Sequence, residues 1–578
     1  MKKILCSLLV LLLCGCSTSN TYSESANEDF NLFLDETYTQ QMELDLLTVY
    51  FSLNDYEAYG IEKPEVTLGE VSYTIEDQEL LEDLLDELES FEYEQLDESQ
   101  QRIYDNLAFD INLSLDRMQY EDLSFLFRPS TGITSSLSTL FTEYKMKNTE
   151  RVEDYLVLLQ DIDRLLDDAL TLSVQQAEAG YFLSDTTIDA TIESIDRFVA
   201  KQEDHAFITT FNDRIDEVDF LSEEEKEDYK LINQQIVLEE VIPSYQKVKE
   251  TLEALKGLSS VQTGISDYPN GQAYYENIVY SQSGSMQTVD ELYEDAFEYV
   301  QNLIFSVQLL AKNQPEAYNE FINYTFVAQD PTAIVDQLVE ESSVYFNPGP
   351  SIYYEVSYLD EGVASDGISA YYLIPEIDLL EENVIRINAA YNEEDPAGMY
   401  LTLAHEGYPG HMYQNTYFLS LDPHPIYSLF SFIGYSEGWA MYSSLFAYDY
   451  LDFENTATSE LFKFDVRLGY VVSMIMDIGV NYYGYDVLEL QEELYDLGLD
   501  YSGQLTILED AMQNVIDEPG QIIPYGAGLM QFDNYLMEVK SELEEDFDYL
   551  DYHQMLIENG PQSFDHLAED VQQYIEEN

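Results

Sequence analysis

Apolar residues at helical spacing within an acidic background are the feature that most constrains this fold. Leu80, Leu84 and Leu88 recur every four residues among carboxylates, and residues 156–169 repeat the pattern. Such one-sided stripes predict amphipathic helices that pack by one face. Glycine is sparse before residue 260, and runs suited to strands occur only near Val384–Asn388 and Ser351–Tyr358. We therefore predict a mainly α fold with a small β element.

A stretch richer in Gly, Ser, Asn and Pro, Leu258–Ser285, marks a soft boundary between two helical regions. The N-terminal region is residues 31–260, and the C-terminal region, residues 261–578, holds most of the histidines. A chain of 578 residues allows several domains, but large helical proteins can share one core, so we expect one continuous fold. Thr288 and Glu291 have capping-box spacing, which predicts a helix start there.

The first residues resemble a bacterial lipoprotein signal. Lys2 and Lys3 precede a short apolar run, and Leu-Cys-Gly-Cys16 ends it in the manner of a lipobox. We expect residues 1–15 to be a signal peptide, Cys16 to be lipidated and residues 16–30 to be a tether. The protein would then be anchored to the extracytoplasmic face of the bacterial cell membrane; a plain secreted protein is the alternative. The other two cysteines leave with the signal, so cysteine ligands and nucleophiles are excluded.

The charge balance restricts the partners. The chain has 114 acidic and 23 basic residues, a net charge of -91, which leaves no basic surface for nucleic acid. Each cation in the C-terminal half is therefore conspicuous, and Arg467 is a candidate for binding the terminal carboxylate of a peptide. An internal salt bridge is the alternative for Arg467. The sequence does not indicate an oligomeric state.

Two histidines around a glutamate suggest a catalytic metal site. His405 and His411 flank Glu406, and in zinc hydrolases of this pattern the imidazoles bind the metal while the glutamate acts as general base. The spacing exceeds His-Glu-x-x-His, and on a regular helix six residues would turn the two histidines to different faces. We expect Pro409-Gly410 to break the helix and return His411 to the metal side.

A third ligand is expected from another helix. Glu437, in Glu-Gly-Trp-Ala, is the best candidate, because two imidazoles and one carboxylate leave the fourth position of a zinc ion for water. The alternative is that Glu437 caps or pairs at a helix start. His424 lies between two prolines and is left out of the set. We predict one Zn²⁺ per chain.

These motifs resemble those of a bacterial family. His-Glu-x-x-Pro-Gly-His followed by Glu-Gly-Trp-Ala is similar to the domain-of-unknown-function family 885, and the resemblance is dense from about residue 270 to 535. Three further segments carry it: Gly271-Gln-Ala-Tyr274-Tyr275, Asp477-Ile-Gly479-Val-Asn481, and Pro519-Gly520-Gln521 with Tyr525 and Gly528. In two places the chain departs from the family, with Asn481 for the usual histidine and Gly526 for a common lysine.

The resemblance implies a large helical fold like that of gluzincin-type zinc metallopeptidases, with a cleft over the metal. It also implies that Tyr525 donates to a developing oxyanion, against the alternative of core packing. Asp477 is a candidate to orient a metal-bound imidazole by accepting a hydrogen bond from the ring nitrogen that does not bind the metal. Asn481 cannot act as an acid or base, although it keeps a hydrogen bond near that position.

The expected function is that of a zinc-dependent hydrolase, a peptidase acting on oligopeptides outside the cytoplasm. Two alternatives stay open: a zinc hydrolase of a non-peptide amide or another small substrate, and a non-catalytic acidic surface lipoprotein. The chain lacks a Gly-x-Ser-x-Gly elbow and a phosphate-binding loop.

Overall fold

The computed structural model is mainly helical, as the sequence predicts, and it describes residues 24–259, 261, 263–359 and 369–578. The signal peptide, Cys16 and most of the expected tether lie outside these residues. Helix α1 begins at Glu24, within the residues expected to form the tether. Phe30, Phe33 and Leu34 on α1 are buried, which explains why this stretch is helical.

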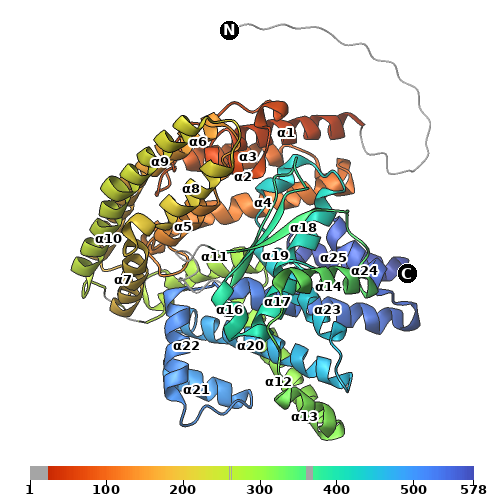
Figure 1. Cartoon of the computed structure of the whole chain (residues 1–578). Helices are drawn as coiled ribbons and strands as arrows, with labels where there is room; N and C mark the ends of the chain where they lie inside the picture. Colours follow the sequence, from red (N-terminus) through yellow and green to blue (C-terminus); the bar gives the residue numbers. More distant parts are fainter. Residues whose placement is uncertain (1–23, 260, 262, 360–368) are drawn as a thin grey trace, which may run out of the picture.

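The N-terminal half is an array of helices that forms the upper and left part of Figure 1. Six apolar residues at helical spacing form part of the buried face of α6, as their spacing predicts: Leu156, Leu159, Ile162, Leu165, Leu166 and Ala169. A short π-helical segment, Val237–Val241, joins the last two helices. The helices are α1 (Glu24–Met42), α2 (Leu46–Ser52), α3 (Ile75–Glu89), α4 (Glu98–Arg117), α5 (Ile133–Glu143), α6 (Thr149–Ala179), α7 (Asp185–Val199), α8 (Ala206–Glu217), α9 (Glu223–Ile236) and α10 (Ile242–Leu255).

The C-terminal half adds further helices. Thr288 caps α12 through the expected capping box with Glu291. The helices are α11 (Gly271–Ser283), α12 (Val289–Asn313), α13 (Pro315–Asn323), α14 (Pro331–Glu341), α16 (Ala389–Glu394), α17 (Pro396–Glu406), α18 (His411–Leu419), α19 (Ile433–Ser444), α20 (Ala457–Asn481), α21 (Val487–Asp496), α22 (Leu505–Asp517), α23 (Ile523–Leu543), α24 (Tyr549–Glu558) and α25 (Phe564–Glu577).

A small sheet lies within this half. It has the order β1-β3-β2, with β1 (Tyr354–Tyr358) parallel and β2 (Ala370–Leu373) antiparallel to β3 (Asn383–Ile387). Ile385 sits at its centre, opposite Val356 on one side and Tyr372 on the other. The two strands expected from the sequence are present, and β2 was not foreseen. Helices α14 and α17 pack against the sheet, which places the end of α17 beside β2.

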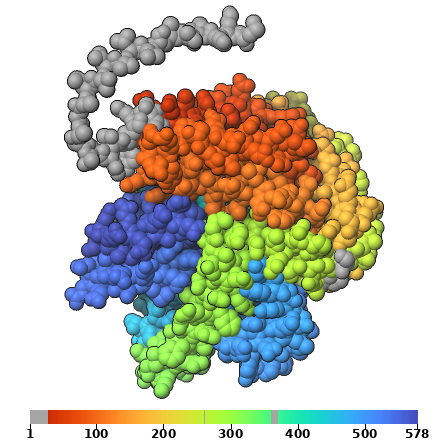
Figure 2. All heavy atoms as spheres, turned by 180° about the vertical axis from the view of Figure 1, so that it is seen from behind, coloured from red at the N-terminus to blue at the C-terminus, as the bar shows by residue number. Residues whose placement is uncertain are grey.

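Two large apolar cores hold the helices together, and each contains residues from both sides of residue 260. Helix α11, within the glycine-richer stretch, packs against α4, α19 and α23. From behind, this yellow-green segment lies between the orange N-terminal layer and the blue C-terminal helices (Figure 2). None of the described helices is both long and apolar enough to cross a bilayer.

Helices α19 and α23 approach each other at a pair of glycines. A Cβ added to Gly438 would lie 2.5 Å from Cα of Gly528, and one added to Gly528 would lie 2.3 Å from the carbonyl oxygen of Gly434. Only residues without side chains permit this separation of the two backbones. The close approach fixes the position of Glu437, next to Gly438, relative to Tyr525, one turn before Gly528.

Replacing Gly528 with alanine tests this packing. Because the new methyl group would meet backbone rather than a movable side chain, we expect Gly528→Ala to lower the free energy of unfolding by about 1–3 kcal/mol in urea titrations. Gly469 in α20 is the matched control, since an added Cβ there meets nothing within 4 Å. Gly469→Ala should be neutral or stabilise by up to about 1 kcal/mol. Equal stability of Gly528→Ala and the wild type would contradict the close approach.

Candidate metal centre

The structure brings the three expected metal ligands together. The ligand atoms of His405, His411 and Glu437 all lie within 4.8 Å of one another. Oε2 of Glu437 is 3.2 Å from Nε2 of His405 and 3.4 Å from Nε2 of His411, and the two imidazole rings are nearly perpendicular. Within the described part of the chain, this is the one group of three or more histidine, cysteine or acidic side chains with such geometry.

The loop between the two histidines explains their unusual spacing. Helix α17 ends at Glu406 and α18 begins at His411, so the break expected at Pro409-Gly410 is the end of one helix and the start of another. The amide of Gly410 donates to the carbonyl oxygen of Ala404 at 3.0 Å. A Cβ at Gly410 would lie only 1.8 Å from the carbonyl oxygen of His405. The tight return therefore requires glycine at this position.

A clamp from α19 holds this loop. Nε1 of Trp439 donates to the carbonyl oxygen of Pro409 at 3.0 Å, and the hydroxyl of Ser443 donates to the same oxygen at 3.1 Å. Trp439 is fully buried. One helix thus supplies both the carboxylate of Glu437 and the donors that fix the loop before His411. The Glu-Gly-Trp motif combines a candidate ligand, a close helix contact and this clamp.

The electrostatics of the three side chains suit a cation. Burial opposes ionisation of Glu437, but the adjacent His405 and His411 outweigh it and hold its pKa below the usual value. Burial disfavours the charged form of His411, yet Glu437 and Glu406 raise its pKa. Oε2 of Glu437 is buried without a hydrogen-bond partner in the described structure. Unsatisfied buried polar atoms are uncommon, and the donor set of two imidazoles and one carboxylate fits zinc.

Glu406 lies beside the three candidate ligands. Its Oε2 accepts a hydrogen bond of 2.9 Å from the backbone N–H of Tyr372 on β2. Burial raises the pKa of Glu406, although His405 and His411 act in the opposite direction. The strand that the sequence did not predict therefore positions the candidate general base.

Tyr525 stands next to the same group. Its ring is 6.2 Å from the ring of His405, nearly parallel to it, and burial together with Glu437 and Glu406 raises the pKa of its hydroxyl. Tyr525, His405 and Glu406 line a cavity of about 340 Å³. Tyr470 lines it too and stacks on Tyr525 at 5.9 Å. Sequence reasoning missed Tyr470, because nothing local distinguishes it among 49 tyrosines.

The expected orienting role of Asp477 is not supported. Its carboxylate accepts hydrogen bonds from Tyr275 (2.8 Å), Asn481 (2.8 Å) and the amide of Gly520 (2.9 Å), and no hydrogen bond joins it to His405 or His411 among the described residues. Asp477 lies two turns beyond Tyr470 on α20, about 10 Å along the axis. Asp477 therefore lies farther along α20 than the candidate metal centre.

Asn481 belongs to this second network. Its Oδ1 accepts from the amide of Ile265 at 3.1 Å, and its Nδ2 donates to Asp477 and to the carbonyl of Val515. The hydrogen bond expected to survive at this position is present, but it serves the packing of α20 instead of the metal ligands.

Arg467 forms the internal salt bridge that the sequence left open. Its Nε and NH2 groups bind both oxygens of Asp533, and Tyr299 donates to the same carboxylate. The arginine and aspartate side chains are 14% and 6% exposed. The substrate-binding role proposed for Arg467 is therefore corrected, because its charge is already neutralised inside the fold.

His424 is outside the candidate ligand set, as expected. Its Nε2 lies 3.3 Å from Asp35, and its Nδ1 accepts from the amide of Ile426.

The comparisons identify the family. The model described as "Bacterial protein of unknown function (DUF885)" matches residues 58–571. The chain belongs to this family. A comparison with curated proteins finds no match for the chain.

Solved structures similar to this DUF885 member show the same fold. One is the "putative lipoprotein from Colwellia psychrerythraea", with a TM-score of 0.78 and 18% identity over 96% of this chain and 100% of that one. Another is a "putative lipoprotein of unknown function from Shewanella oneidensis", with a TM-score of 0.61 and 14% identity over 94% of this chain and 99% of that one. At these identities the likeness establishes the fold alone.

The Asp477 network predicts a pH effect on stability. Burial raises the pKa of Asp477 to about 7, against the hydrogen bonds that it accepts. The native state then binds more protons than the unfolded chain between about pH 4 and 7, so this group's contribution to the free energy of unfolding decreases as the pH rises, by about 4 kcal/mol at most. In urea titrations across this range, Asp477→Asn should lose stability less steeply than the wild type.

Glu376 provides the control. It is also fully buried, but Lys145 and Lys147 overcome the effect of burial and lower its pKa, so its stabilisation is lost only as the pH falls towards acid values. The pH profile of Glu376→Gln should therefore run parallel to that of the wild type from about pH 5 to 7. If the pH profile of Asp477→Asn also ran parallel to that of the wild type, the raised pKa of Asp477 would be contradicted.

Proposed function

We propose that this DUF885 protein is a zinc-dependent hydrolase that cleaves oligopeptides outside the cytoplasm. The observation that carries the proposal is the convergence of His405, His411 and Glu437 beside Glu406 and Tyr525. The resemblance of the motif to gluzincin-type metallopeptidases supports the same conclusion. The small cluster of donors, two imidazoles and a carboxylate, leaves one position open for water.

Each residue of the site has a role in this proposal. His405, His411 and Glu437 would hold Zn²⁺, which, when bound, lowers the pKa of a water molecule and polarises a carbonyl group. Glu406, held by the amide of Tyr372, accepts the proton of the attacking water and delivers it to the leaving amine. The hydroxyl of Tyr525 remains protonated, because burial and the nearby carboxylates raise its pKa, and it donates to the developing oxyanion.

The location follows from the N-terminal sequence. Lys2, Lys3 and the Leu-Cys-Gly-Cys16 ending support export and lipidation of Cys16, and two proteins of the same fold are each described as a "putative lipoprotein". We infer that the acyl chain anchors the protein at the extracytoplasmic face of the bacterial membrane. Its substrates would then be peptides that reach that surface.

Glu406→Gln tests the function. Since the amide cannot accept the proton of water, we expect the variant to keep one zinc per chain while its kcat for peptides falls by about 10²–10⁴. Metal content is measured by elemental analysis and cleavage by digestion of a peptide library. Glu394→Gln, at an exposed glutamate on α16, is the control and should keep both zinc and activity.

Three other outcomes separate the alternatives. Absence of stoichiometric zinc, or full activity of Glu406→Gln, would refute the mechanism. A zinc-loaded wild-type protein that cleaves no peptide in the library but hydrolyses small amides would favour the non-peptide hydrolase. Zinc without any hydrolysis would favour a non-catalytic surface lipoprotein.

A further inference from the structure

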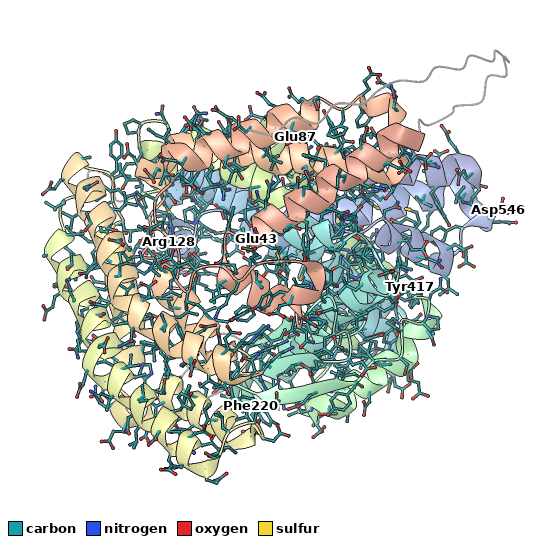
Figure 3. The ribbon with its side chains drawn as sticks, turned by 90° about the horizontal axis from the view of Figure 1, so that it is seen from above. Glu43, Glu87, Arg128, Phe220, Tyr417 and Asp546 are labelled. Carbon is teal, nitrogen blue, oxygen red and sulfur yellow. The ribbon has the colours of Figure 1, made fainter. Side chains whose placement is uncertain are left out.

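A second cavity lies on the Glu437 side of the candidate metal centre. It has a volume of about 730 Å³, within the range of about 300–1,000 Å³ that is usual for ligand pockets. Phe51, Ser52 and Tyr59 from the N-terminal half line one side, and residues within 372–377 and 415–437, together with Pro561, line the rest. In the view from above, the pale red helices α1 and α2 lie next to the teal segment that carries Tyr417 (Figure 3).

Strand β2 connects this cavity to the candidate metal centre. Ala370, near the start of the strand, lines the 340 Å³ cavity together with His405 and Glu406. Two residues further on, the amide of Tyr372 binds Glu406, and Tyr372 itself lines the larger cavity. Glu437 also lines the larger cavity. A group bound between Glu406 and Glu437 is therefore adjacent to both spaces.

The lining of the larger cavity is mainly apolar and aromatic. Phe418, Tyr427, Phe430 and Phe432 form a chain of ring contacts with centroids 5.1 to 6.1 Å apart. Ile374 is 58% exposed, which places an unburied apolar side chain on the wall of the cavity. Exposed apolar surface of this kind gains free energy when a ligand covers it.

The ionisable groups of the lining are few and mostly acidic. Besides the tyrosines, they are Asp422, His424 and Glu437, and His424 already contacts Asp35. In a chain with a net charge of -91, an acidic side chain entering this cavity would be repelled, whereas an uncharged apolar one would not. The mixture of aromatic rings with a few polar groups suits an amino-acid residue better than a long acyl chain.

The wall beyond β2 is held in place before any ligand binds. The buried carboxylate of Glu376 forms salt bridges with Lys145 at 2.6 Å and Lys147 at 2.8 Å. The amide of Ile377 donates to the carbonyl of Ser52, and Asp378 accepts from the amide of Asn54. Such a preformed cavity loses little entropy when it is filled.

We propose that this cavity is a specificity pocket that accepts a large apolar side chain, preferably aromatic, adjacent to the peptide bond that is cleaved. The proposal rests on the proposed hydrolase function, because it places the pocket next to the bond that is cleaved. The binding preference itself can be measured without catalysis. The substrate class is then neutral peptides with an internal or near-terminal phenylalanine, tyrosine or leucine. Peptides with aspartate or glutamate at that position would be poor ligands.

Calorimetric binding to zinc-loaded Glu406→Gln protein tests the pocket separately from turnover. The probes are blocked pentapeptides Gly-Gly-X-Gly-Gly in which X is Phe, Ala or Glu. We expect the phenylalanine peptide to bind about tenfold or more tightly than the alanine peptide, because burying the ring adds apolar contact. In the wild type, kcat/KM should follow the same order.

Ile374 offers a substitution that is compatible with folding, since its side chain is already exposed. Ile374→Asp, made in the Glu406→Gln protein, should reduce the preference for the phenylalanine peptide over the alanine peptide by about tenfold. Ile374→Lys should bind the glutamate peptide more tightly than the Glu406→Gln protein does. Ile322 on α13 is the matched control, because it is 57% exposed and does not line the cavity. Ile322→Asp should leave all three affinities unchanged.

The outcomes distinguish the two proposals. Equal affinities for the phenylalanine and alanine peptides, or no response to either Ile374 variant, would overturn the pocket even if the wild type cleaves peptides. The expected preference in a protein that hydrolyses nothing would support the pocket as a peptide-binding site and refute the hydrolase. The preference with matching cleavage supports both.

Discussion

The site depends on how closely two helices can approach. Gly438 and Gly528 allow α19 and α23 to meet backbone to backbone, and the residues next to this contact are Glu437 and Tyr525. The same α19 then reaches across with Trp439 to hold the loop before His411. A single tightly packed helix thus sets the distances between Glu437, Tyr525 and His411, so a shift of α19 would change all of them together.

Electrostatics distinguishes this centre from the other buried charges. Arg467 is neutralised by Asp533, and Glu376 by two lysines, so the partners of those charges lie inside the fold and leave no charge for a ligand. At the candidate metal centre, by contrast, the ion-pair partners of Glu437 among the described residues are the imidazoles of His405 and His411, with no lysine or arginine among them. A buried carboxylate with these partners is the feature that a bound cation would satisfy.

The sequence predicted those structural features that depend on the spacing of neighbouring residues. The helical stripes, the capping box at Thr288, and the break between His405 and His411 were all foreseen, because each depends on neighbouring residues. Strand β2 and the network around Asp477 were not, and the salt bridge of Arg467 was expected only as an alternative, without its partner. Strand β2 is defined by pairing with β3, and a salt bridge or a hydrogen-bond network depends on which distant carboxylates or amides the fold brings close. Among 114 acidic residues, no pattern singles out Asp533 as the partner.

The coordination of zinc in the purified protein tests the central claim most directly. A crystal structure of the zinc-loaded chain, checked by X-ray absorption, should show one ion with Nε2 of His405 and of His411 at about 2.0–2.1 Å and a Glu437 oxygen at about 2.0–2.2 Å. Water should fill the remaining position, within reach of Glu406. Zinc bound elsewhere, or bound without His411 or Glu437, would contradict the account.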